Sequence, residues 1–149
     1  MDKFDWFKIA CKLTLDLEGK DKYTNNPKDP GGPTKYGISG RYHPGVDIEN
    51  LTQEGAEHIY YEEYYIPAKC EEQGTVQMAV CLFDSQVNPQ NDPKLPGGGN
   101  QEILNLHPEN WQDYNNLRMA RYMRCSSPDF VKGHIFRVLR LSQSIREIK

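Results

Sequence analysis

The sequence predicts a single, mainly α-helical domain that spans residues 1–149, with a central buried helix and a Pro/Gly-rich loop. Three observations predict this class. Apolar residues recur at helical spacing in several segments, strand-like alternation is weak, and 149 residues is the usual size of one domain. An aromatic content of 11%, with nine tyrosines, argues against a disordered chain. We therefore expect one helical body with a substantial core.

The first three helices are predicted from apolar spacing and from the residues at their ends. One runs from about residue 4 to Gly19. Thr52 is a suitable N-cap for a second helix, because its hydroxyl can accept from a backbone N–H of the first turn, and Pro67 should end that helix. Residues 75–87 are apolar almost all round, which is typical of a central buried helix.

Two further helices and two loops complete the prediction. A fourth helix is expected near residues 110–124, and a fifth begins after Ser127 and Pro128 and continues to about residue 146. Residues 20–37 and 88–100 are rich in proline and glycine, which do not continue helices. Because loops of this length in a compact domain often carry function, the first of them is the expected active-site loop.

The chain lacks the features of a membrane or exported protein. No stretch approaches the roughly 20 apolar residues that a membrane span requires. The first 20 residues are interrupted by acids and lysines every few positions, unlike the apolar core of a signal peptide. We therefore expect a protein made in the cytoplasm, without membrane insertion and without a recognisable signal peptide.

The cysteine and histidine patterns predict no metal site. The four cysteines lie far apart without a C-x-x-C pair, and the four histidines are scattered; the cysteines are Cys11, Cys70, Cys81 and Cys125. Two disulfides are compatible with this pattern, although free thiols are commoner in a chain without an export signal. The run "LPGGGN" lacks the Lys-Ser/Thr of a phosphate-binding loop. The sequence thus predicts no metal and no organic cofactor.

Charge is distributed unevenly along the chain. Residues 1–117 contain 10 Lys and Arg against 19 Asp and Glu, whereas residues 118–149 contain 8 against 2. A basic end can bind an anionic polymer such as nucleic acid or a charged cell wall. We favour the alternative, in which the basic end neutralises the acidic part of the same molecule, and expect no nucleic-acid partner.

Asp84, in the apolar helix, should accept hydrogen bonds from a loop backbone or pair with Arg137.

The segment around the first loop has the residues that glycoside hydrolysis needs. Glu18 ends a helix beside Leu17, whose apolar side chain can shelter the carboxyl and help it to keep a proton for a leaving oxygen. Inversion at the sugar carbon requires a second carboxylate that activates water on the opposite face. Asp29 lies between two prolines in a turn that can fold back over the helix end, and the Thr34 hydroxyl can hold the same water.

Four stretches of the chain resemble glycoside hydrolase family 108, a family of phage and bacterial peptidoglycan muramidases also known as secretion activators. They read "LEG…YTNNPKDPGGPTKYGIS", "DIENLTQEGAEHIYYEEYY", "AVCLFDSQVN" and "RMARYMR…PDFVKGHIFRV", and they cover most of the chain. The run "DPGGPTKYGI" is specific to the family and the others are moderately so. The order of the acidic residues and the threonine is also similar to that of the phage-type lysozymes.

The resemblance implies a fold and a set of roles. The fold would be a lysozyme-like helical domain, and Glu18 would be the catalytic acid. Asp29 and Thr34 would handle the attacking water, while Tyr36 and Asn88 would contact the saccharide.

The chain departs from the family in two places. Family members usually read Glu-Gly-Gly-Tyr, whereas residues 20–22 add about two positions here and leave Asp21 as an alternative to Asp29. After Asn88 the family tends towards a small residue and glycine, whereas Pro89 opens a second loop.

The expected activity is that of an N-acetylmuramidase, an endolysin of lysozyme type from a phage or prophage. It would cleave the β-1,4 bond between N-acetylmuramic acid and N-acetylglucosamine with inversion, as a monomer acting on peptidoglycan after release to the wall or periplasm. Two alternatives remain open. One is a lytic transglycosylase, which uses a single glutamate and leaves an anhydro product. The other is a non-catalytic peptidoglycan-binding or secretion-accessory protein.

Overall fold

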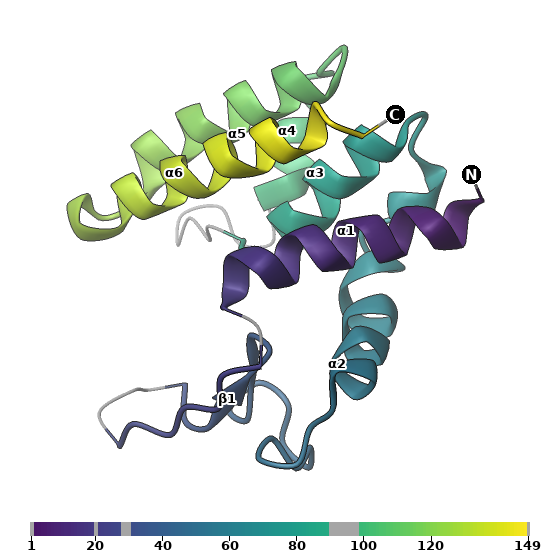
Figure 1. The fold of residues 1–149 in the computed structure, drawn as a ribbon. Helices are drawn as coiled ribbons and strands as arrows, with labels where there is room; N and C mark the ends of the chain where they lie inside the picture. Colours follow the sequence, from purple (N-terminus) through teal and green to yellow (C-terminus); the bar gives the residue numbers. More distant parts are fainter. Residues whose placement is uncertain (1, 20, 28–30, 90–98, 149) are drawn as a thin grey trace.

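The structure, a computed structural model, describes residues 2–19, 21–27, 31–89 and 99–148, and it is mostly helical (Figure 1). This confirms the predicted fold class. The helices in this part of the chain are α1 (Lys3–Glu18), α2 (Gln53–Tyr60), α3 (Val76–Val87), α4 (Gly99–Leu104), α5 (Trp111–Cys125) and α6 (Pro128–Ile145), with a π-helix at Tyr61–Tyr65 and a 3₁₀ helix at Cys70–Glu72. Two short strands, β1 (Thr34–Lys35) and β2 (Ile38–Ser39), form a hairpin.

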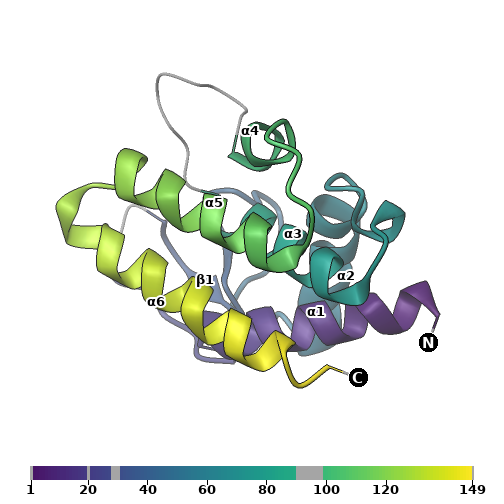
Figure 2. The ribbon, with the colours of Figure 1, turned by 90° about the horizontal axis from the view of Figure 1, so that it is seen from above.

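Helix α3 lies at the centre of the helical body. Its residues from Ala79 to Ser85 are all buried, and it packs against α1, α4, α5 and α6. Thr75 caps its first turn by accepting a hydrogen bond from the Met78 amide at 3.2 Å. Figure 2 shows α5 and α6 side by side on one side of α3. The all-round apolar pattern of residues 75–87 is thus explained by burial on several sides.

Helix α1 separates the helical body from the hairpin. In Figure 1, β1 and α2 lie on one side of α1, while α3, α5 and α6 lie on the other. Asp2 caps the start of α1, with its Oδ1 atom 2.8 Å from the Asp5 amide. Gly19 ends the helix in the left-handed conformation, with φ at 88°. Glu18 is therefore the last residue of a helix that borders both parts of the molecule.

The hairpin turns at Tyr36 and Gly37. Both residues have positive φ angles, 52° and 77°, as a two-residue turn of type I′ requires. Thr34 faces Ser39 across the hairpin, and its backbone also pairs with that of Thr24. The prediction that "TKYGI" forms a short strand or turn is confirmed.

The structure differs from the predicted elements at two places. Thr52 caps α2 as expected, but the α-helix ends at Tyr60 and continues to Tyr65 as a π-helix instead of an α-helix that reaches Pro67. In this conformation Tyr61 stacks on Tyr65 with ring centroids 5.8 Å apart. The second difference is α4, which starts at Gly99 inside the predicted loop. It has only six residues, too few to give a helical period in the sequence.

Candidate active site

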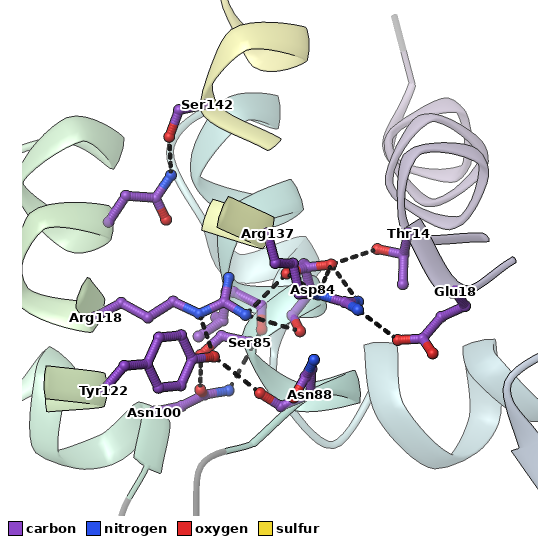
Figure 3. Close-up of polar contacts among 12 residues, drawn as sticks. Thr14, Glu18, Asp84, Ser85, Asn88, Asn100, Arg118, Tyr122, Arg137 and Ser142 are labelled. Atoms are coloured by element: carbon purple, nitrogen blue, oxygen red, sulfur yellow. Dashed lines mark hydrogen bonds and ion pairs between the residues drawn. The ribbon is translucent and has the colours of Figure 1, made fainter. Parts of the chain in front are cut away.

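Glu18 projects from the end of α1 into an ion pair with Arg137 of α6. Its Oε1 atom lies 2.6 Å from Arg137 Nη1, and the Glu18 side chain is 24% exposed. Figure 3 shows the Glu18 carboxylate pointing towards Arg137, which lies between it and Asp84 of α3. The Glu18 carboxylate is therefore partly exposed to solvent, and the Arg137 guanidinium binds it on its protein side.

Asp84 holds Arg137 in place from within the core. The Asp84 carboxylate is fully buried and accepts from Arg137 Nη2 at 2.7 Å and from Nε at 3.1 and 3.2 Å. It also contacts Arg118 Nη2 at 2.8 Å and accepts from the Thr14 hydroxyl at 3.3 Å. The predicted pairing of Asp84 with Arg137 is confirmed. Two acids and two arginines thus alternate from the core to Glu18, so their formal charges cancel.

The buried members of this network remain charged. Burial raises the pKa of Asp84, but Arg118 and Arg137 outweigh burial and bring that pKa below its ordinary value. Burial lowers the pKa of Arg137, yet Asp84 and then Glu18 reverse this, so its pKa lies above the ordinary value. Arg137 is therefore a permanent cation beside Glu18.

The hairpin turn packs against the side chain of Glu18. A Cβ atom added to Gly37 would lie 3.2 Å from Glu18 Cγ and 2.5 Å from the Tyr60 hydroxyl oxygen. That hydroxyl donates to the Tyr36 carbonyl at 2.7 Å and so ties the turn to α2. Burial raises the pKa of Tyr60, and the Glu18 carboxylate raises it further, so the hydroxyl remains a donor. The absence of a side chain at Gly37 lets the hairpin approach Glu18.

A cleft of about 490 Å³ opens beside this network. The described residues that line it come from the ends of α1 and α3 and from one face of α6; they are Leu17, Asn88, Gly133, His134, Phe136, Arg137 and Arg140. Glu18 does not itself line the cleft, but it is paired with Arg137, which does. A partly exposed carboxyl can donate a proton to, or accept one from, a bound molecule that comes within hydrogen-bond distance.

The structure places the other predicted site residues in different surroundings. Asn88 lines the cleft, and its carbonyl accepts from the Tyr122 hydroxyl at 3.0 Å. Tyr36 lines a separate cavity of about 610 Å³ between α1 and α2, and Asp21 lies in the same cavity. The Thr34 hydroxyl donates to the Gly32 carbonyl at 3.2 Å, inside the base of the hairpin. Asp29 lies outside the described residues.

Sequence reasoning did not identify Arg118 as part of this site. Its side chain is 1% exposed, and its Nε donates to the Tyr122 hydroxyl at 2.8 Å. One signal was available, because Arg118 is four residues from both Tyr114 and Tyr122 and so lies on the apolar face of the helix. An arginine on such a face requires a buried acid, and Asp84 was the candidate.

The described residues contain neither a membrane-spanning helix nor a cluster of metal ligands. None of the helices in the described part of the chain is long and apolar enough to cross a membrane. Within residues 2–19, 21–27, 31–89 and 99–148, no three His, Cys, Asp or Glu side chains are grouped so that they could hold a metal ion.

Comparisons with known proteins give a family and a fold. The family model described as "Glycosyl hydrolase 108" matches residues 11–89, which include α1 from its middle, the hairpin and α3. The structure of SagA from Brucella abortus superposes with a TM-score of 0.66 at 20% sequence identity, covering 94% of this chain and 93% of that one. Curated protein sequences gave no match. The fold of SagA and that of this chain are thus alike over nearly their whole lengths.

Proposed function

The chain belongs to the glycosyl hydrolase 108 family, and we propose that it is an N-acetylmuramidase. Membership of this family implies a function of the peptidoglycan-hydrolase type. The proposed reaction is hydrolysis of the β-1,4 bond between N-acetylmuramic acid and N-acetylglucosamine. The observation that carries the proposal is Glu18, a partly exposed carboxyl in the family-matched segment that is paired with Arg137, a residue of the cleft wall.

In the proposed mechanism Glu18 acts as the general acid. The Glu18 carboxylate first takes up a proton from solvent, to which its side chain is partly exposed, and then transfers it to the glycosidic oxygen as the bond from that oxygen to the sugar carbon breaks. Arg137 does not contact the reacting atoms in this scheme. It positions the Glu18 carboxyl, because its own guanidinium is fixed by hydrogen bonds to the buried Asp84. The carboxylate left on Glu18 after transfer is stabilised by the same cation.

The attacking water requires a base on the opposite face of the sugar. We assign this role to Asp29 with Thr34, following the family resemblance: the water oxygen bonds to the sugar carbon while its proton passes to the Asp29 carboxylate, with inversion. Thr34 belongs to the hairpin whose turn packs on Glu18, which supports the proposed role of Thr34. Asp21 lines the Tyr36 cavity and remains the alternative base.

A lytic transglycosylase is the second candidate. Its reaction needs one glutamate, because the hydroxyl of the muramic acid itself attacks and an anhydro sugar results. One observation favours it: the described residues that line the cleft include no carboxylate. The products of the two reactions differ by the mass of one water, so mass spectrometry separates them.

We propose further that the chain works as a single-domain monomer at the bacterial cell wall. It would be made in the cytoplasm and reach the wall after release or secretion, as an endolysin of a phage or prophage does. Contacts of Tyr36 and Asn88 with the saccharide remain part of the proposal. Since these residues line different cavities, they would bind different sugar units.

The test is to incubate purified peptidoglycan with the wild type and with Glu18→Gln. We expect Glu18→Gln to release reducing ends at least about a hundredfold more slowly, because glutamine has no proton to donate. Glu54→Gln, on the exposed side of α2, is the matched control and should retain full activity. Equal release by the wild type and Glu18→Gln would show that Glu18 is not the acid. Wall binding by the wild type without any release would indicate the non-catalytic alternative.

A further inference from the structure

One face of α6 forms the long side of the cleft beside Glu18. The residues that α6 contributes include Gly133, Phe136, Arg137 and Arg140, which are spaced three, one and three positions apart. At 3.6 residues per turn these positions share one face of the helix. The same face therefore carries both the arginine that holds Glu18 and, one turn further along, a second arginine.

Arg140 differs from the other arginines near the cleft in having no acidic partner among the described residues. Arg118 and Arg137 are buried against Asp84, and Arg137 also meets Glu18. Arg140 is exposed, and within the described part of the chain its guanidinium makes no ion pair or hydrogen bond. It is a cation that lines the cleft, and none of the described residues neutralises it.

Two further α6 residues shape the side of the cleft that this helix forms: Phe136 adds an apolar surface, and Gly133 leaves room for a ligand. The Phe136 side chain is 64% exposed although it lies beside the cleft. A Cβ atom added to Gly133 would meet no other atom within 4 Å, so the helix leaves this part of the cleft open. His134, the remaining α6 residue of the wall, packs on Tyr122 with ring centroids 4.8 Å apart. Burial lowers the pKa of His134, and Arg118 and Arg137 lower it further, so Arg140 is the free cation of this wall among the described residues.

We infer that the α6 wall, Gly133, Phe136 and Arg140, binds the stem peptide carried by the muramic acid of the substrate. This inference rests on the proposed function, since it concerns the same cleft. In intact peptidoglycan the lactyl carboxyl is joined to the peptide, so the free carboxylates of a strand lie on the peptide and not on the sugar rings. Arg140 would bind such a carboxylate, and the Phe136 ring would cover the adjacent alkyl groups.

The inference makes the enzyme selective for strands that carry peptides. A strand whose peptides carry no free carboxylate presents no anion to Arg140, whereas an untreated stem peptide can reach from the muramic acid along α6. Because exposed ion pairs are weak, removal of Arg140 alone should lower kcat/KM by less than about fivefold, and reversal of its charge by more. The effect should also fall as salt screens the pair.

The test compares two substrates with Arg140→Glu and with Arg146→Glu as the matched control. Arg146 is exposed at the end of α6 and is not among the residues that line the cleft. One substrate is intact peptidoglycan freed of wall phosphate polymers, and the other is the same material after carbodiimide and excess methylamine have converted its peptide carboxylates to neutral methylamides. Release of reducing ends gives kcat/KM for each. Phe136→Ala is compared with Leu139→Ala, which truncates an exposed residue of α6 outside the cleft.

We expect Arg140→Glu to lower kcat/KM about tenfold on untreated strands through a higher KM, and to change it less than twofold on strands whose peptide carboxylates are neutralised. The loss should shrink at 0.5 M salt, where the Debye length is about 4 Å instead of about 10 Å at 0.1 M. Equal losses on both substrates, or a loss no larger than that of Arg146→Glu, would overturn the inference. These results are distinct from failure of the proposed function, in which the wild type itself releases no sugar ends from either substrate.

Discussion

At the scale of single residues, Gly37 controls how closely the hairpin approaches the acid. We predict that Gly37→Ala destabilises the protein by about 2–4 kcal/mol, because alanine is strained at a φ of 77° and its Cβ would lie 2.5 Å from the Tyr60 hydroxyl oxygen. The displaced turn would also shift Glu18, so the activity of the folded protein should fall at least about tenfold. Urea unfolding and release of reducing ends measure the two effects.

Gly45→Ala is the control that separates strain from contact. Gly45 has a φ of 99°, and an added Cβ would meet no atom within 4 Å. Its substitution should therefore cost only the conformational strain, about 1–2 kcal/mol, and leave activity unchanged. If Gly37→Ala and Gly45→Ala were equally active and equally stable, the close packing of the hairpin on Glu18 would contribute neither to activity nor to stability.

The residues of the site could be predicted from the sequence only in part. Glu18 was identifiable because a glycine follows it at the end of an apolar helix and a specific motif follows in the loop. The pairing of Asp84 with Arg137 was identifiable because a buried acid needs a cation. The spacing of Arg118 from Tyr114 and Tyr122 indicated burial, but its contact with Asp84 itself depends on how α5 packs on α3. Likewise, only the folded chain shows that Tyr36 and Asn88 line different cavities.

At the scale of elements, local sequence signals predicted most of the helices. They did not predict where an α-helix changes to a π-helix. Pro128 and Ser127 marked the start of α6, and Thr52 marked the start of α2. The change from α- to π-helix after Tyr60 has no local signal, because the tyrosines that follow adopt it in contact with one another and with Phe7 of α1. Tertiary packing, rather than helix propensity, determines the conformation of such a segment.

The cap of α2 gives a prediction at this scale. Thr52 Oγ1 accepts from the Gly55 amide at 3.1 Å, so Thr52→Ala should lower the free energy of unfolding by about 1 kcal/mol. Thr52→Ser keeps the hydroxyl and should retain most of that stability. Urea unfolding of the two variants provides the measurement. Indistinguishable midpoints for alanine and serine would mean that the cap does not stabilise α2.

At the scale of the whole molecule, the basic C-terminal part neutralises acids elsewhere in the same chain. Arg118 and Arg137 pair with Asp84, and Arg137 also pairs with Glu18. Arg121 and Arg124 of α5 both pair with Glu102 of α4; the Arg121 contact measures 2.7 Å. Four of the eight basic residues after position 117 thus join α5 and α6 to the rest of the protein. The internal neutralisation that the sequence favoured holds for these four, whereas Arg140 is unpaired among the described residues.

Asp84 is the point where α1, α3, α5 and α6 meet, so its charge should matter to the stability of the whole molecule. We predict that Asp84→Asn lowers the free energy of unfolding by about 3–5 kcal/mol near neutral pH, because it leaves Arg118 buried without an acid. The exposed Glu147→Gln, as control, should change it by less than about 0.5 kcal/mol.

The effect of Asp84 should also depend on pH in a defined direction. The pKa of Asp84 is lower in the folded protein than its ordinary value of 3.8, so the folded state favours the ionised form. The stability that ionisation contributes is therefore fully present above that ordinary value and is lost as the pH falls through the lower, folded-state pKa. The difference in unfolding free energy between the wild type and Asp84→Asn should shrink over this acidic range. Urea unfolding between pH 7 and pH 2 measures it, and a difference that stayed constant across the series would contradict a charged Asp84 at the centre of the network.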